Sequence, residues 1–309
     1  MIYLVVINPV SGDSNKKSLT YFLQEQAQSK GFDLEIFETT GNNDYEKLNE
    51  QVDFVRPDKL LVAGGDGTLL MAAEVVKNKE IPIGLFPLGS ANGMAAELDL
   101  PSMLPNIPIL DQQSFKKAWK IIEDGHSVKV DMVRINGKYS IHLADVGLNA
   151  EIVRGFDESD SRGFATYAHQ FFQKYTSRKA FNYSVRTNDG RLYSGEAYML
   201  SIANARMFGT GAIINPRGNV SDGTVELCVI KKASALSILK SASSIITGNV
   251  EYDADQVEII SVKKASIELE PAQSFQIDGE LQKPVSKVDV SILPSVVEVY
   301  CSKEFKDQT

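Results

Sequence analysis

The chain has 309 residues, of which 43% are hydrophobic and 23% are charged, which is the composition of an ordinary globular protein with a sizeable core. Its formal net charge of −8 argues against a broad nucleic-acid-binding surface. No run approaches the roughly 20 apolar residues that a membrane-spanning helix needs, and the apolar start, residues 1–7, lacks the basic segment of a signal peptide. We therefore expect a cytoplasmic protein whose two cysteines, Cys228 and Cys301, are buried free thiols.

Strand and helix patterns alternate over residues 1–126. Short apolar runs that end at turn residues indicate strands, and apolar residues three to four positions apart indicate helices. The predicted strands are 1–7, 34–37, 60–63 and 81–86, and the predicted helices are 18–31, 45–55, 69–76 and 115–124. The proline-rich residues 101–109 indicate a connection. The alternation predicts a doubly wound parallel sheet, in which the loops that follow the strands line one ligand-binding edge.

From residue 127 onward the apolar period changes to two, which predicts antiparallel strands. Asn136-Gly137 and Asp189-Gly190 are hairpin turn signals. The predicted strands are 128–135, 139–143, 181–187, 191–203, 225–230, 257–262, 265–270, 286–292 and 296–301, and the predicted helices are 165–176 and 233–246. We therefore expect two domains, an α/β domain over 1–126 and a mostly antiparallel β-sandwich or open barrel over 127–309.

Two glycines, an aspartate, a third glycine and a threonine, Gly64–Thr68, stand between the predicted strand 60–63 and the helix that follows it. Glycines let the backbone approach oxyanions, and the free N–H groups and dipole of a helix N-terminus favour negative charge. A Gly-rich loop of this kind also occurs without any ligand. The embedded aspartate and threonine favour a phosphate-binding loop here.

These motifs, in this order, resemble the diacylglycerol kinase catalytic-domain superfamily, which includes soluble bacterial lipid kinases and sphingosine kinases. The matching pieces are Asn8–Gly12, Thr40, Gly64–Thr68, Pro87–Asn92, Asn204, Gly209–Gly211, Pro216, Asp222-Gly223 and Asp278–Glu280. A Gly-Gly-Asp-Gly-Thr motif alone also fits NAD kinases, but the ordered set is specific to the lipid kinases. The resemblance implies a two-domain ATP-dependent kinase with its active site in the interdomain cleft. It also implies that the final segment, about 294–309, packs back against the first domain.

The resemblance implies that the first domain binds ATP, with loop N–H groups and the threonine hydroxyl at the phosphates. The residues concerned are Asn8, Ser11, Thr40, Gly64, Gly65, Asp66, Gly67, Thr68, Ser90 and Asn92. Asp66 is expected to act through Mg²⁺, because a bare carboxylate beside phosphates is repulsive. Its alternative role is to cap the next helix, and the polar residues of the other loops have ordinary turn or capping roles as alternatives.

Asp278-Gly279-Glu280 is the candidate catalytic element. A lipid hydroxyl that attacks a phosphorus atom needs positioning and a proton acceptor, and two carboxylates around a tight glycine turn can serve both needs. By resemblance one of Asp278 and Glu280 is the base, and the sequence does not decide which. The alternative is a solvated Asp-Gly turn.

Asn219–Thr224 resembles a second Mg²⁺ site of the bacterial relatives, with Asp222 as the carboxylate and the carbonyls of Asn219 and Thr224 as further ligands. The alternative is a plain turn. Asn204, Asp145 and Asn149 are candidate substrate residues. Gly93 and Asn149 stand where many relatives have aspartate, so these two positions leave the choice of substrate open.

Together these features predict an ATP- and Mg²⁺-dependent lipid kinase that phosphorylates a primary hydroxyl of a diacylglycerol-like or sphingoid-like lipid. Such an enzyme would contact a membrane surface transiently and would need no nucleic acid. Whether it forms a homodimer stays open. The alternatives are an NAD kinase-like enzyme and a non-catalytic module that binds lipid or nucleotide.

Overall fold

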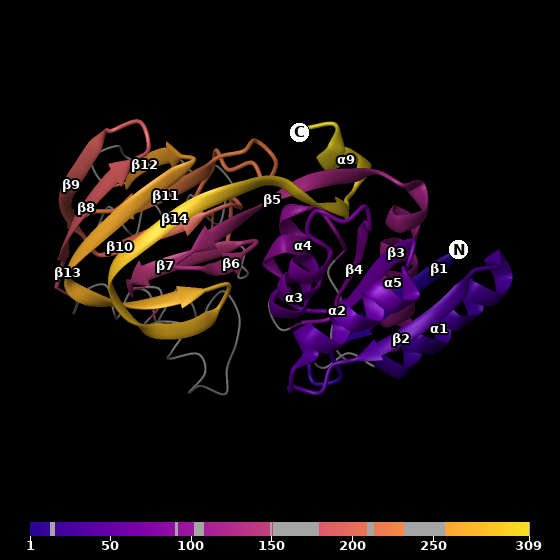
Figure 1. The fold of residues 1–309 in the computed structure, drawn as a ribbon. Coiled ribbons are helices and arrows are strands. Elements are labelled where there is room, and N and C mark those ends of the chain that lie inside the picture. The colour runs from indigo at the N-terminus through magenta and orange to yellow at the C-terminus, as the bar shows by residue number, and fades with distance from the viewer. Residues whose placement is uncertain are drawn as a thin grey trace. The chain divides into compact units, whose positions relative to one another are not determined.

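Figure 1 shows the computed structural model, which describes residues 1–12, 16–89, 92–101, 108–148, 150, 179–208, 213–231 and 257–308. The chain divides into two compact units, one of Met1–Val130 with Ser295–Thr309 and the other of Asp131–Pro294. The strands β5 (Ser127–Ile135) and β14 (Glu280–Tyr300) each contain residues of both units. The predicted helices 165–176 and 233–246 lie outside the described residues.

The first unit is built on a parallel sheet with the strand order β2-β1-β3-β4. The strands are β1 (Ile2–Ile7), β2 (Asp33–Glu38), β3 (Lys59–Gly64) and β4 (Ile83–Pro87). The end of β14 extends this sheet, because Val299 pairs with Ile83 in parallel register. β1, β3 and β4 are buried along nearly their whole length, as expected for strands that are covered on both faces.

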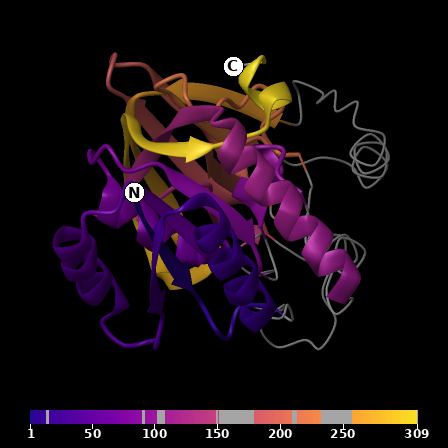
Figure 2. The same cartoon turned by 90° about the vertical axis from the view of Figure 1, so that its right-hand side faces the viewer.

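Helices cover both faces of this sheet. The described helices of this unit are α1 (Lys16–Lys30), α2 (Asp44–Val55), α3 (Asp66–Val76), α4 (Gly93–Glu97), α5 (Pro108–Asp124) and α9 (Lys303–Lys306), and α1, α2, α3 and α5 contact the strands. α1 and α5 lie side by side (Figure 2), and their apolar residues share a core with Tyr3, Val5 and Ile7 of β1. The pleat turns Leu4 and Val6 to the other face, where α2 and α3 contact each other and the strands. The predicted doubly wound α/β domain is therefore confirmed.

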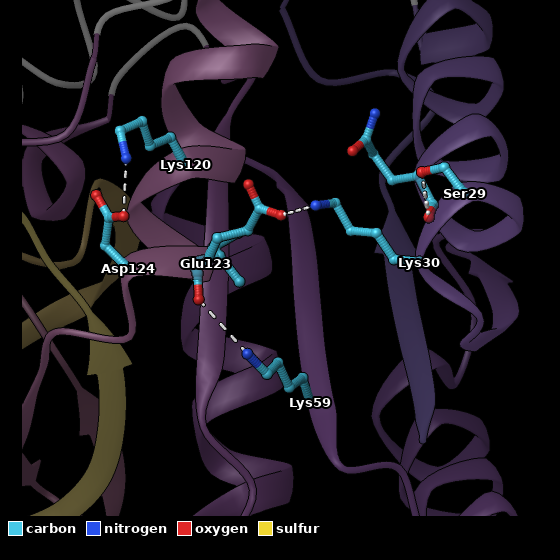
Figure 3. Close-up of polar contacts among 8 residues, drawn as sticks. Ser29, Lys30, Lys59, Lys120, Glu123 and Asp124 are labelled. Carbon is cyan, nitrogen blue, oxygen red and sulfur yellow. Dashed lines mark hydrogen bonds and ion pairs between the residues drawn. The ribbon is translucent and has the colours of Figure 1, made fainter.

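Polar contacts tie the end of α5 to α1 and to the sheet (Figure 3). Glu123 of α5 forms an ion pair with Lys30 of α1. Lys59 of β3 donates a hydrogen bond of 3.4 Å to a carbonyl oxygen of α5. The Lys59 ammonium also lies 5.3 Å from the ring centroid of Tyr3 and 4.7 Å from that of Tyr300. These cation–π contacts link the C-terminal strand of the chain to the first one.

The second unit is a β-sandwich-like domain whose strands are mainly antiparallel, as predicted. Its further strands are β6 (Lys138–Ser140), β7 (Leu143–Gly147), β8 (Phe181–Thr187), β9 (Leu192–Ala197), β10 (Met199–Ala203), β11 (Val225–Ile230), β12 (Val257–Val262) and β13 (Lys264–Ile277). β13 joins two layers, because Ala265–Glu270 pairs with β8 and Phe275–Ile277 pairs with β7. One apolar core draws residues from both layers.

The structure divides some predicted strands of the second unit differently, although nearly all of their residues lie in strands as predicted. The predicted strand 191–203 is two strands, β9 and β10, because the chain changes layer at Tyr198. There the Tyr198 N–H donates to the carbonyl of Ile230, and the Tyr198 carbonyl accepts from the N–H of Leu148. The predicted strands 286–292 and 296–301 are one continuous strand, β14, which runs from the pairing with β13 to the pairing with β4.

The predicted connection 101–109 also ends earlier than expected, because α5 begins at Pro108. Proline is well tolerated in the first turn of a helix, where its missing N–H has no intrahelical partner to lose. Both cysteines are buried free thiols, as predicted. Within the described residues, no helix has the length and apolar content to cross a membrane.

We predict that Phe86→Ala lowers the free energy of unfolding by about 3–5 kcal/mol, because this fully buried ring of β4 would leave a cavity in the first unit. Phe54→Ala on α2 is the matched control. Its ring is 88% exposed, so the same substitution should change stability by less than about 0.5 kcal/mol. Urea unfolding of both variants measures the difference, and equal losses would contradict the assignment of the core.

Candidate functional site

The Gly-rich loop joins β3 to α3 with almost no intervening chain. β3 ends at Gly64 and α3 begins at Asp66. A Cβ atom on Gly64 would lie 2.5 Å from Thr68 Oγ1, so only glycine fits while the threonine folds back against the strand end. The Gly64 carbonyl accepts the N–H of Leu88, which fixes the loop against the end of β4.

Three loops at the carboxyl edge of the sheet pack backbone against backbone. Asn8 Nδ2, after β1, donates to Thr68 Oγ1 at 3.3 Å. A Cβ on Gly12 would lie 2.3 Å from the carbonyl oxygen of Leu88, and a Cβ on Gly89 would lie 2.4 Å from Gly65 Cα. The structure therefore brings together the predicted loops after β1, β3 and β4. Ser11 closes the first of them, where its hydroxyl donates to the carbonyl of Asn8 at 2.9 Å.

Thr40 lies in the loop after β2, and its described hydrogen bonds are local. The carboxylate of Asp44, the first residue of α2, accepts bonds from the N–H of Thr40 at 2.9 Å, from its hydroxyl at 2.9 Å and from the N–H of Gly41 at 2.7 Å. Desolvation acts to raise the pKa of Asp44, but these hydrogen bonds and the charge of Lys47 together lower it. A role of Thr40 in nucleotide binding stays a prediction.

Asp66 bonds to the start of α4, whereas its alternative role from sequence is to cap the next helix, α3. Its carboxylate accepts hydrogen bonds from the N–H groups of Gly93 at 2.8 Å and Met94 at 3.1 Å. These residues open α4, so Asp66 satisfies N–H groups that have no partner within that helix. The contact couples the loop after β3 to the loop after β4, and action through Mg²⁺ stays a prediction.

Asn92 closes the loop after β4. Its Oδ1 accepts the N–H of Gly89 at 3.0 Å, and its Nδ2 donates to the Gly89 carbonyl at 2.8 Å. Asn92 is the N-cap residue of α4, yet its side chain makes no capping hydrogen bond, so it shapes the loop rather than the helix. Ser90 lies outside the described residues.

The carboxylate of Asp278 lies in a cradle of donors. It accepts hydrogen bonds from the Ser140 hydroxyl at 2.7 Å and from three successive N–H groups, those of Ile141 at 2.9 Å, His142 at 3.3 Å and Leu143 at 2.9 Å. The predicted strand 139–143 therefore exists as β6 but ends earlier than expected, at Ser140. β6 stops at Ser140 because the next N–H groups turn to the carboxylate instead of a neighbouring strand.

Two opposing effects act on the ionisation of Asp278. Desolvation of its carboxylate raises the pKa, while the nearby His142 and the hydrogen bonds from Ile141, Ser140 and Leu143 oppose that rise. The net direction is upward, so the protonated form is easier to populate than in an exposed aspartate. A carboxyl group with a raised pKa suits a group that must accept a proton during a reaction.

Asp278 and Gly279 form the two-residue turn between β13 and β14. Their φ angles are 47° and 87°, both positive as in a type I′ hairpin turn. The alternative of a solvated Asp-Gly turn is therefore half correct. The backbone forms that turn, but the aspartate carboxylate is held by hydrogen bonds and is not free in solvent. Glu280 differs, because it is exposed and its carboxylate makes no hydrogen bond to another described residue.

The segment 219–224 folds as a compact turn. Asp222 Oδ1 accepts the N–H of Thr224 at 2.9 Å and its hydroxyl at 2.8 Å, and Asn219 Oδ1 accepts the N–H of Ser221 at 3.0 Å. Burial raises the pKa of Glu226 nearby, and the charge of Asp222 adds to that rise. One carboxylate with neighbouring carbonyls is an oxygen donor set that fits Mg²⁺. No group of three or more His, Cys, Asp or Glu side chains suited to a metal occurs among the described residues.

Two of the three predicted substrate residues can be placed. Asn204 is buried, and its Nδ2 donates to the carbonyls of Asp131 at 2.9 Å and Ile141 at 2.8 Å, which braces the segment that cradles Asp278. Asp145 is fully buried on β7. Asn149 lies outside the described residues. Contact of any of them with substrate stays a prediction.

Sequence reasoning missed Ser140, Gln276 and His142. His142 lies between β6 and β7. The His142 side chain is buried, and its ring nitrogen Nε2 lies 2.8 Å from the carbonyl oxygen of Met207. The backbone N–H of His142 donates to the Asp278 carboxylate. No sequence signal could have revealed the cradle, because most of its donors are backbone groups that every residue carries.

Comparison with known proteins accounts for both units. Residues 2–135 match the diacylglycerol kinase catalytic domain, and residues 143–301 match the YegS C-terminal NAD kinase beta sandwich-like domain. The chain belongs to this diacylglycerol kinase family. A diacylglycerol kinase of Staphylococcus carnosus is 26% identical over 313 residues, which cover 98% of this chain and 96% of that protein.

Two solved structures place the fold. A putative diacylglycerol kinase of Bacillus anthracis has a TM-score of 0.76 at 21% identity, covering 98% of each chain. An NAD kinase of Archaeoglobus fulgidus has a TM-score of 0.54 at 14% identity, covering 100% of this chain and 96% of its own. At these identities the likeness concerns the fold alone. Membership in a lipid kinase family indicates a phosphotransferase and implies the use of ATP.

We predict that Ser140→Ala raises the pKa of Asp278 further. The Ser140 hydroxyl donates to the ionised carboxylate and favours it, so the loss of this bond favours the protonated form. A pH titration of the Asp278 carboxyl carbon by NMR measures the change. Ser184→Ala on β8 is the control and should leave the titration unchanged, and a lowered pKa in the Ser140 variant would contradict the cradle.

Proposed function

We propose that this protein is a kinase that transfers the γ-phosphoryl group of ATP, with Mg²⁺, to a primary hydroxyl of a diacylglycerol-like or sphingoid-like lipid. The observation that carries the proposal is the Asp278 carboxylate, held by four donors in a hairpin turn and with a raised pKa. Family membership supplies the reaction class, and this carboxylate supplies a group that can do the proton chemistry.

The loops of the first unit would hold the nucleotide. Gly64, Gly65 and Gly67 bring backbone N–H groups to the N-terminus of α3, where the helix dipole favours phosphate oxygens. Close packing of the loops after β1, β3 and β4 gives the site a fixed shape before ATP arrives. Such preorganisation reduces the cost of ordering the loops on binding.

We assign the role of base to Asp278 and, within it, to Oδ2. Oδ1 accepts from Ser140, His142 and Leu143, whereas Oδ2 accepts only from Ile141 among the described residues and keeps acceptor capacity. Oδ2 would take the proton of the attacking lipid hydroxyl. Glu280, exposed in the position after Gly279, would orient that hydroxyl.

Mg²⁺ would neutralise charge that develops on the transferred phosphoryl group. Asp222 with the carbonyls of Asn219 and Thr224 would hold one such ion, and Asp66 would act through another. Asp66 already accepts two N–H groups of α4, so its replacement also disturbs that helix. Loss of activity in an Asp66 variant would therefore not assign a metal role by itself.

The lipid substrate implies a cytoplasmic enzyme that contacts the membrane surface transiently to reach its acceptor. Because the fold resembles that of an NAD kinase, NAD is the alternative phosphoryl acceptor that must be tested. The decisive experiment is phosphoryl transfer from labelled ATP with Mg²⁺ into a panel of lipids in mixed micelles, with NAD in a separate reaction. Labelled lipid supports the proposal, labelled NAD replaces it, and a protein that binds ATP without labelling any acceptor would be a non-catalytic module.

We predict that Gly89→Ala weakens ATP binding by roughly tenfold or more, because the new Cβ would collide with Gly65 and push the phosphate-binding loop aside. Gly195→Ala on β9 is the control, since its Cβ would meet only ordinary contacts at 3.5 Å or more. Calorimetric titration with ATP compares the two. An unchanged affinity for ATP in Gly89→Ala would contradict the assignment of this loop to the nucleotide site.

We predict that Asp278→Asn lowers kcat by about 10²–10⁴-fold, the range that a general base contributes, with the affinity for ATP unchanged. Glu280→Gln is the paired variant and should lower kcat less, because it orients the substrate without taking the proton. Steady-state kinetics on the labelled lipid measures both. A larger loss of kcat in Glu280→Gln than in Asp278→Asn would instead make Glu280 the base and Asp278 the orienting residue.

A further inference from the structure

A buried polar relay connects the Asp278-Gly279 turn to the middle of the second unit. Gln276, which is 2% exposed, lies on β13 two residues before Asp278. Its Oε1 accepts the N–H of Gly279 at 2.7 Å, and its Nε2 donates to Asp145 Oδ2 at 2.5 Å. Asp145 is fully buried on β7 and is the direct cross-strand partner of Gln276. Two buried side chains therefore link the turn to a neighbouring strand.

The chemistry of the two ends fixes the direction of this relay. The N–H of Gly279 can only donate, and an ionised Asp145 can only accept. A glutamine amide between them satisfies both ends in one orientation, with its oxygen toward Gly279 and its nitrogen toward Asp145. The Gly279 N–H therefore fixes the orientation of the Gln276 amide, and Asp145 accepts the hydrogen bond from its nitrogen.

The turn has two anchors in addition to its own backbone, which an Asp-Gly pair adopts readily as a type I′ turn. Asp278 has a φ of 47°, in the left-handed region that residues other than glycine adopt infrequently. The carboxylate of Asp278 is anchored on one side by the segment 140–143, and the N–H of Gly279 is anchored on the other by Gln276. With both anchors in place, the directions of Asp278 and Glu280 are set together.

We propose that Gln276 and Asp145 are positioning residues, which hold the Asp278-Gly279 turn in the geometry that the reaction uses. The catalytic consequence rests on the proposed kinase function, whereas the relay itself is a property of the fold. From the sequence, Asp145 is expected to contact substrate. In this proposal it acts instead through Gln276, which holds the turn.

The first test is Gln276→Glu, which keeps the shape and removes the donor that faces Asp145. Two ionised carboxylates at this distance repel each other strongly, and neither can donate to the other, so the relay survives only while the pair retains one proton. The titratable groups that the described residues place at this pair and its turn include Asp145 itself, Asp278, His142 and Glu280. Hydrogen exchange of the Gly279 N–H should therefore accelerate by roughly tenfold relative to the wild type as the pH rises, and kcat should fall over the same range.

The second test restores the relay with its polarity reversed. When Gln276→Glu is combined with Asp145→Asn, the introduced amide can donate to one oxygen of the introduced carboxylate, while the other oxygen accepts the N–H of Gly279. This double variant should regain slow exchange and a kcat close to that of the wild type, without the pH step. Rescue by exchange of the two functional groups is not expected from packing alone.

Ser201→Ala is the matched control. Ser201 lies on β10 directly opposite Asp145, is fully buried and has no hydrogen-bond partner for its hydroxyl among the described residues. Its loss should leave exchange at Gly279 and kcat unchanged. If Gln276→Glu fails to fold, Asp145→Asn, which keeps an acceptor for Gln276, should retain slow exchange, and Asp145→Leu should lose it.

The outcomes separate this inference from the proposed function. Unchanged exchange at Gly279 in Gln276→Glu at every pH, or a folded double variant without rescue, overturns the relay. If the wild type labels no lipid, the kinase proposal fails, and exchange at Gly279 still decides whether the relay holds the turn. Altered exchange with an unchanged kcat in an active enzyme would leave Gln276 a structural residue and overturn its positioning role.

Discussion

The hydrogen bonds that converge on the Asp278 carboxylate are the interaction on which the second unit depends. They take the N–H groups of residues 141–143 out of strand pairing, which ends β6 and starts β7 in its own register. They also hold the turn between the long strands β13 and β14. A half-buried carboxylate without these donors would be costly, and three buried N–H groups without the carboxylate would be costly as well. Each side of the contact therefore requires the other.

In the first unit the corresponding constraint is the close approach of three loops. The contacts of Gly65 with Gly89 and of Gly12 with Leu88 leave no room for a Cβ. Glycine in these positions lets the backbone groups at the ends of β1, β3 and β4 come together at one edge of the sheet. A parallel sheet places its strand ends there in any sequence, but only small residues allow the loops to touch.

Several motif residues have structural partners as well as expected functional ones. Asp66 bonds to the start of α4, Asn92 to the main chain of Gly89, and Thr40 to Asp44. These contacts do not exclude ligand binding, because a carboxylate or a hydroxyl oxygen can accept more than one hydrogen bond. They do mean that the same side chains shape the loops that carry them. Variants at these positions therefore need a readout of loop structure beside a readout of activity.

The sequence by itself determined the parallel α/β unit, the β-rich second unit, the family, and the motifs Gly64–Thr68 and Asp278–Glu280. Periodicity and turn residues are local signals, and the motif order along the chain is specific. Only the tertiary structure decided which groups surround Asp278, that Gln276 and Asp145 stand behind its turn, and that the chain changes layer at Tyr198. Apart from the bond between Gln276 and Gly279, these contacts join residues far apart in sequence, often through backbone N–H groups that are the same in every residue, so no local pattern encodes them.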